Sequence, residues 1–375
     1  MAKPNVVHIE GVLTITPSKI TEPRQVRQVS ANDPIGLDLF GQCLHVVLYY
    51  KKASQEDSGW LQAGWMKESL ARALADQPMI SGRLCRRLDI VDDDLDQQPP
   101  QHDQLEIVSN DSGVRLMEAR IPTTLSEFLD SKTRQVAEAE LVFWKDIDEQ
   151  NPQFCPLFFV QVTNFECGGY SIGISCSLLL ADLLFKEKCF LQKWAKIHNN
   201  ITSQNNNAPK TPIFYLPNLK KDGFPVEGFF SSRPSKKNSG QTFIFKIGIA
   251  ETSVAVDNTL ALLCVEEAES KLSNKMASEF PLFLNHPNNA VQVEKCSKLH
   301  AATTLSPKPN LGITSEGLGW DDILGAEDVE FLAGNQPLHV SHWIGSISGG
   351  LVYCDHEGLF GGKIMVTIPK ESTQI

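Results

Sequence analysis

Three side chains that could take part in group-transfer chemistry lie within one short stretch: Cys176, Ser177 and Asp182. A serine hydroxyl is a weak nucleophile unless a neighbouring base activates it, and an unassisted cysteine thiol has a pKa near about 8.5. An aspartate that starts a helix most often caps it, which is a structural role. The stretch therefore offers two weak candidate nucleophiles without an evident partner base.

The segments on either side of this stretch predict the elements that hold it. Leu157–Thr163 is rich in aromatic and β-branched residues, as expected of a buried strand. The pair Gly168 and Gly169 favours a tight turn, after which Tyr170–Ser177 forms the returning strand. A helix to about His198 follows, because its apolar residues recur at the spacing of a buried helical face.

The sequence also predicts a helix and a following strand upstream of this stretch. Apolar residues between Leu61 and Leu74 indicate an amphipathic helix that stops before Pro78. The run from Pro78 to Leu84 (Pro-Met-Ile-Ser-Gly-Arg-Leu) then predicts a strand entry, with Arg83 on the surface.

Together these motifs, in this order, resemble the plant BAHD acyl-CoA-dependent acyltransferases. Members of that superfamily carry histidine-x-x-x-aspartate after the strand, with the histidine as general base. Asp182 occupies the aspartate position here, so position 178 should be histidine, and it is leucine. The resemblance implies that Asp182 is structural, turned away from substrate and paired with an arginine.

The resemblance also implies an α/β fold of two chloramphenicol acetyltransferase-like halves, each a mixed sheet with flanking helices. We expect an N-terminal domain over residues 1–198, a crossover linker rich in proline and asparagine over 199–241, and a shortened C-terminal domain over 242–375. The family's Asp-Phe-Gly-Trp-Gly-like run, which props the two domains together, survives only as Glu330, Phe331 and Gly334.

Within the superfamily the chain looks most like the eceriferum/Glossy branch, which is associated with very-long-chain fatty-acid elongation for surface waxes. Some members of that branch act without an intact catalytic motif. One hypothesis is therefore an accessory protein that binds acyl-CoA or a long acyl chain and assists a fatty-acid condensing enzyme at the endoplasmic reticulum. The alternative is an active O- or N-acyltransferase that uses a base other than the family histidine, with Ser177 and Cys176 as weak candidates.

Neither hypothesis requires a permanently bound cofactor or a metal, and acyl-CoA is the expected substrate or ligand. Only one basic cluster could contact the coenzyme A phosphates or an acidic partner, and a solvated linker is the simpler interpretation of it. Its members are Lys220, Lys221, Arg233, Lys236 and Lys237.

Composition narrows the choice of partners and compartment. The chain has 375 residues, of which 42% are hydrophobic, and a formal net charge of -11, which argues against nucleic acid or an anionic membrane as the main partner. We find no signal-peptide pattern and no apolar run long enough to span a bilayer. Nine cysteines without metal-site spacing indicate reduced, mostly buried thiols. We expect a cytoplasmic monomer, peripheral to the endoplasmic reticulum or shared between nucleus and cytosol.

Three further expectations concern local structure. Leu105–Val108 and Val114–Ile121 should form a hairpin around the turn at Asp111, and Leu125 to about Ala139 should form one helix capped by Thr123 or Thr124. The segment from Pro23 to Pro34 should be a loop.

Overall fold

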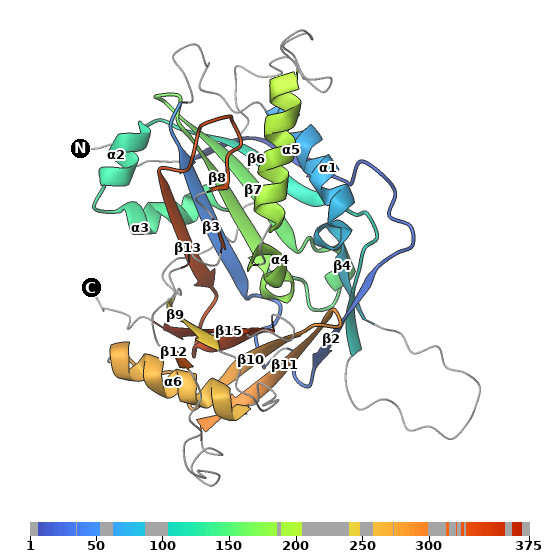
Figure 1. Ribbon diagram of the computed structural model, residues 1–375, viewed down its shortest axis with the longest axis vertical. Helices are drawn as coiled ribbons and strands as arrows, with labels where there is room; N and C mark the ends of the chain where they lie inside the picture. Colours follow the sequence, from blue (N-terminus) through green and yellow to red (C-terminus); the bar gives the residue numbers. More distant parts are fainter. Residues whose placement is uncertain are drawn as a thin grey trace.

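Two mixed β-sheets, with helices on their faces, make up the computed structural model, which confirms the α/β class (Figure 1). The structure describes residues 7–34, 36–52, 63–86, 104–185, 189–204, 240–247, 258–272, 274–298, 313–314, 320, 324–325, 328–356 and 362–369.

The first sheet has six strands and is built around the predicted β7–β8 hairpin. Its order is β1 (His8–Ile15), β6 (Val114–Ile121), β7 (Phe158–Phe165), β8 (Tyr170–Ser177), β3 (Cys43–Tyr50) and β13 (His339–Gly345). Only the β6–β7 pair is parallel. The hairpin turn needs glycine, because Gly168 has a φ of +85° and a Cβ on Gly169 would lie 3.0 Å from the Tyr50 carbonyl oxygen.

The second sheet has nine strands. Its order is β12 (Ile313–Thr314), β9 (Gly240–Ile247), β15 (Gly362–Pro369), β14 (Leu351–His356), β10 (Glu279–His286), β11 (Ala290–Ser297), β2 (Val26–Ala31), β5 (Gln104–Val108) and β4 (Arg83–Arg86). Each sheet therefore contains strands from both halves of the chain, since β13 lies in the first and β2, β4 and β5 lie in the second.

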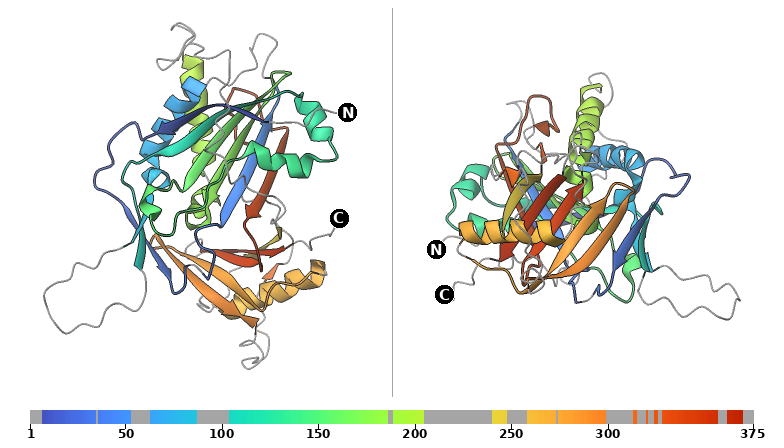
Figure 2. Two further views of the ribbon diagram at one scale, coloured as in Figure 1. Left: turned by 180° about the vertical axis from the view of Figure 1, so that it is seen from behind. Right: turned by 60° about the horizontal axis from the view of Figure 1, so that its bottom comes forward.

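Helices cover the faces of both sheets. Helices α1 (Ala63–Asp76) and α5 (Phe190–Gln204) pack against each other over one face of the first sheet, and α2 (Leu125–Asp130) and α3 (Arg134–Ala137) lie on its other side (Figure 1). Helix α6 (Asn258–Leu272) covers β14 and β15 of the second sheet (Figure 2). The short helix α4 (Asp182–Phe185) follows β8 and faces the second sheet.

The predicted hairpin between β5 and β6 is wrong. The two strands lie in different sheets, and the turn between them carries the chain from the second sheet to the first. Side-chain and backbone bonds fix this crossing, because Thr21 donates to both carboxylate oxygens of Asp111 through its amide (2.9 Å) and its hydroxyl (2.6 Å). The turn signal was correct, but a turn does not determine which strands its flanks pair with.

Arg83 is not a surface residue, contrary to expectation. Its side chain is buried and donates to the backbone carbonyls of Ser81, Gly82, Ser112 and Gly113. Burial, and then the nearby charge of Arg115, lower the pKa of Arg83 to about 10. The guanidinium therefore fastens the start of β4 to the crossing turn.

Several other elements differ from the sequence-based prediction. The segment expected to be a loop contains strand β2. The helix expected over 125–139 divides into α2, α3 and a 3-10 turn, η2 (Glu138–Leu141). Thr124 caps α2 with a complete capping box, as predicted.

Most of the cysteine thiols are buried and all nine are free, as predicted. The domain limits stay a prediction. Helix α5 continues to Gln204, and residues 205–239 of the expected linker lie outside the described residues.

The buried His198 of α5 joins this helix to α1. Its Nδ1 lies 3.0 Å from the Ser69 hydroxyl, which also accepts a hydrogen bond from the Trp194 indole at 3.0 Å. Burial lowers the pKa of His198 to about 4, despite an opposing backbone hydrogen bond at Trp65. The ring is therefore neutral in the folded protein well below the ordinary value of 6.5.

We predict that this histidine makes the fold sensitive to mild acid. Its contribution is complete above pH 6.5 and is lost as the pH falls toward 4, because only the unfolded chain binds the proton readily. Between pH 7 and pH 5, the free energy of unfolding of the wild type should fall by about 2 kcal/mol more than that of His198→Asn, as measured by urea unfolding. The exposed His8→Asn variant is the control, and equal losses in wild type and His198→Asn would contradict the prediction.

Candidate functional site

Leu178 lies at the point where β8 of the first sheet ends. It begins the 3-10 turn η4 (Leu178–Leu180), and its amide donates to the carbonyl of Gln42 at 3.3 Å. The side chain is 1% exposed and belongs to the main apolar core, which contains residues of both sheets. An aliphatic group therefore occupies the position where the resemblance implies a base.

The two candidate nucleophiles next to Leu178 are not activated. The Ser177 hydroxyl is buried and accepts a hydrogen bond from the amide of Leu179 at 3.4 Å, which caps η4. The Cys176 thiol is also buried, and it points to the carbonyl of Ser177 at 3.4 Å. Burial, and then the negative charge of Asp182, raise the pKa of Cys176, so the thiolate is disfavoured.

Asp182 begins α4 and is committed to a buried ion pair. Its Oδ1 accepts from the Arg27 guanidinium at 2.7 Å, and both side chains are at most 3% exposed. Arg27 also donates to Asn285 Oδ1 at 2.6 Å, and the Asn285 amide donates to Asp355 Oδ1 at 2.7 Å. This four-residue chain, the Arg27 network, connects α4 to strands β2, β10 and β14 of the second sheet.

Aromatic rings pack beside the Arg27 network, in a part of the core that is buried from water. Tyr353 packs edge-on against Phe185 of α4, with ring centroids 5.8 Å apart, and stacks on Phe283 at 6.1 Å. Burial, and then the charges of Asp182 and Asp355, raise the pKa of Tyr353 well above its ordinary value. The phenol is therefore neutral, and the Arg27 network acts as a structural joint between α4 and the second sheet.

A second group of chemically capable side chains lies on the opposite face of the first sheet. His45 places Nε2 3.1 Å from the Cys43 sulfur and Nδ1 2.8 Å from the Ser175 hydroxyl, with its ring 5.0 Å from that of Trp343. All of these side chains are buried, and burial raises the pKa of Cys43 well above its ordinary value. The arrangement looks like a nucleophile and base but is a hydrogen-bonded part of the core.

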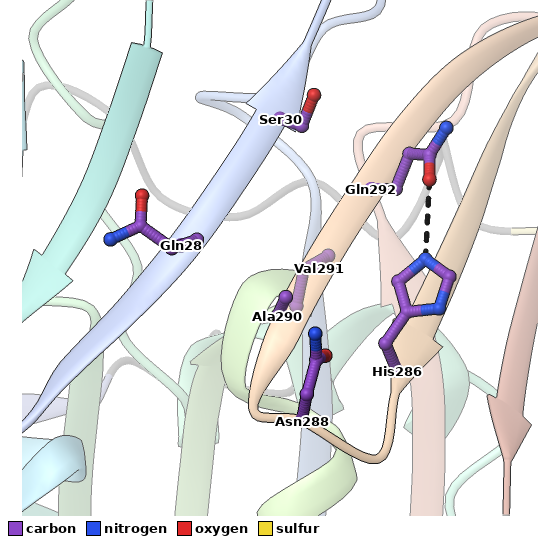
Figure 3. Close-up of a pocket in the computed structure, with 7 residues that line it drawn as sticks. All are labelled: Gln28, Ser30, His286, Asn288, Ala290, Val291 and Gln292. Atoms are coloured by element: carbon purple, nitrogen blue, oxygen red, sulfur yellow. Dashed lines mark hydrogen bonds between the residues drawn. The ribbon is translucent and has the colours of Figure 1, made fainter.

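A polar pocket of about 280 Å³ lies on the outer face of the second sheet (Figure 3). Its lining includes Gln28, Ser30, His286 and Gln292, and His286 Nε2 is 3.2 Å from Gln292 Oε1. Arg27 and Asn285 precede two of these residues in the chain and face inward, so the pocket opens away from α4. It is therefore separate from Leu178.

The remaining residues predicted to form the site are not gathered around Leu178. Gly168 and Gly169 lie in the turn at the other end of β8, roughly 30 Å away at the usual rise per strand residue. The five residues of the basic cluster, 220 to 237, lie outside the described residues. In the part of the chain that is described, no group of three or more His, Cys, Asp or Glu side chains could hold a metal ion.

Glu330, Phe331 and Gly334 lie near Tyr50, at the end of the first sheet where β8 begins. Phe331 is fully buried, with its ring 4.8 Å from that of Trp194, and Glu330 accepts from the amide of Gly334, whose φ is +69°. Tyr50 donates to the carbonyl of Val329 at 2.7 Å. The remnant of the family run therefore lies at the end of the first sheet beside Tyr50.

Sequence reasoning missed the partners of Asp182. Arg27 lies 155 residues from Asp182, and Asn285 lies 258 residues from Arg27, which it binds in turn. No local pattern in the sequence marks either pair. The only available signal was the expectation, from the resemblance, that some arginine pairs with the aspartate.

The fold is a two-sheet α/β structure joined by the buried aspartate–arginine pair. The sequence of residues 6–242, more than half of the chain, matches the model of the Transferase family. The chain belongs to this family of BAHD acyltransferases and is related to the eceriferum branch.

Three curated relatives illustrate the match. The chain is 30% identical to Protein ECERIFERUM 26 of Arabidopsis thaliana over 54% of this chain and 42% of that protein. It is 32% identical to Protein ECERIFERUM 2 of Arabidopsis thaliana (28% and 24%), and 29% identical to a hydroxycinnamoyltransferase of Narcissus pseudonarcissus (47% and 36%). The chain thus spans less than half the length of each of these relatives.

Among solved structures, vinorine synthase aligns over 98% of this chain and 96% of that one, with 16% identity and a TM-score of 0.45. None of the helices in the described ranges is long and apolar enough to cross a membrane.

We predict that Arg27 and Asp182 stabilise the fold only as a pair. Arg27→Met should lower the free energy of unfolding by about 3–5 kcal/mol, because it leaves a buried carboxylate without its cation. The double variant Arg27→Met/Asp182→Leu should recover much of that loss. A double-mutant cycle of urea unfolding measures the coupling, and strictly additive losses would contradict the prediction.

Proposed function

We propose that this protein binds long-chain acyl-CoA without transferring the acyl group, and that it assists very-long-chain fatty-acid elongation or wax biosynthesis. The observation that carries the proposal is the buried leucine at position 178. A positioned general base contributes about 10²–10⁴-fold to the rate of such a transfer. Leucine has no lone pair with which to supply it.

Two further observations support this choice over an active acyltransferase with another base. Ser177 and Cys176, the candidate replacements, are buried, and burial raises the pKa of the thiol. The Arg27 network meanwhile keeps the strand-to-helix geometry of the family without providing chemistry. The site thus retains its framework and lacks its proton acceptor.

The relationship to the eceriferum branch supports a role in elongation. The partner we propose is a fatty-acid condensing enzyme at the endoplasmic reticulum, with this protein a monomer on the cytoplasmic side. An accessory protein of this kind would act by binding the acyl chain during elongation, so its effect would appear in the length of the products.

We predict that restoring the histidine does not restore catalysis. In Leu178→His the imidazole would enter an apolar, buried environment, which lowers its basicity and makes the position less favourable for an acyl chain. Free thiol released from palmitoyl-CoA, with alcohols or amines as acceptors, should stay at background in wild type and in the variant. Binding of palmitoyl-CoA to the variant should weaken.

Leu179→His, at an equally buried neighbouring position, is the matched control. Turnover by wild type that survives Ser177→Ala and Cys176→Ala would reject the non-catalytic proposal and require a base elsewhere. Turnover gained by Leu178→His alone would show that only the base was missing.

The elongation role predicts a change in product length. Microsomes containing a plant condensing enzyme should form longer acyl chains when this protein is co-expressed, and gas chromatography of the fatty acids measures this. Arg27→Met, which breaks the joint between the sheets, should abolish the shift. An unchanged chain-length profile with wild-type protein would contradict the elongation role while leaving acyl-CoA binding to be measured directly.

A further inference from the structure

A buried amide lies directly beside Leu178. Gln42 is only 4% exposed, and its Oε1 has no hydrogen-bond partner among the described residues. A buried acceptor left unpaired costs free energy, so such an atom in a folded protein needs an explanation. A ligand that donates a hydrogen bond would provide one.

The position of Gln42 follows from the pairing of β3 with β8. Gln42 precedes β3, and its carbonyl accepts the amide proton of Leu178 at 3.3 Å, one step beyond the paired Cys43 and Ser177. Continuing the alternation of β3 back by one residue puts Gln42 on the same face as Leu44. Leu44 and Leu178 belong to the same apolar core, so the amide lies on the side of β3 that faces this core.

The chemistry of the free atom limits what it can bind. A carboxamide oxygen only accepts hydrogen bonds and takes no proton near neutral pH, so it selects for an N–H or O–H group and cannot replace the lost base. In an acyl-CoA the nearest N–H to the thioester sulfur is the first amide of the pantetheine arm, two methylene groups away. A thioester held at position 178 would bring that amide close to residue 42.

We propose that Gln42 is a ligand-binding residue that accepts a hydrogen bond from the first pantetheine amide of a bound long-chain acyl thioester. This rests on the proposed function and adds its selectivity. The apolar core accommodates the acyl chain, and Gln42 distinguishes a thioester of the pantetheine type from a free fatty acid.

The test compares ligands that keep or lack this amide. Isothermal titration would measure the binding of palmitoyl-CoA, the palmitoyl thioester of N-acetylcysteamine (the first amide without the nucleotide) and palmitic acid (no amide). Gln42→Met keeps the size of the side chain and removes the acceptor. This variant should weaken the binding of both thioesters by about 3- to 10-fold and change the binding of palmitic acid by less than about twofold.

Asn164 provides the matched control. Its amide is fully buried, both of its polar atoms lack hydrogen-bond partners among the described residues, and it lies on β7 opposite Tyr170, far from Leu178. Asn164→Leu should leave all three affinities unchanged. Asn164→Leu should also leave the urea midpoint unchanged, because neither polar atom of this side chain makes a hydrogen bond within the described structure that would be lost.

The possible failures are distinct. If Gln42→Met weakens the binding of all three ligands equally, or does not weaken the binding of the thioesters, the assignment of Gln42 is overturned while acyl-CoA binding by wild type still stands. Weakening of palmitoyl-CoA but not of the N-acetylcysteamine thioester would place the contact on the nucleotide end and also overturn it. Wild type that fails to bind palmitoyl-CoA would overturn the proposed function and this inference together.

Discussion

The ion pair between Arg27 and Asp182 is the contact on which the arrangement of the two sheets depends. Asp182 begins the short helix that follows β8 of the first sheet, and Arg27 lies on β2 of the second. Through Asn285 and Asp355 the same charge reaches β10 and β14. Because these groups are buried, each is tolerated only while its partners are in place, so the network specifies one relative position of the sheets.

The shared strands reinforce this joint. The β13 strand completes the first sheet from the C-terminal side, while β2, β4 and β5 extend the second from the N-terminal side. Arg83 holds the turn through which the chain passes from one sheet to the other. Separating the N- and C-terminal parts of the chain would therefore break backbone ladders within both sheets, and separating the sheets would break the ion pair.

Local patterns predicted the elements well and their partners poorly. The β7–β8 hairpin and the helices α1 and α5 follow from apolar periodicity and glycine turns, which act over a few residues. The β5–β6 hairpin failed because the same turn chemistry serves a crossing between sheets. Arg27 and Gln42 could not be found this way. Their importance comes from a distant carboxylate and from an adjacent strand end, and both contacts exist only after the chain has folded.

The structure separates the framework of an acyltransferase site from its chemistry. Glu330 and Phe331 stabilise one end of the first sheet, and the Arg27 network stabilises the other, yet neither supplies a proton acceptor. Leu178, at the position where the resemblance implies a histidine, disturbs neither support, because its side chain belongs to the same core as its neighbours. Catalysis depends on a single side chain, whereas the fold depends on contacts spread across both sheets. The framework does not need the base in order to fold, which is consistent with the proposed role in binding an acyl chain.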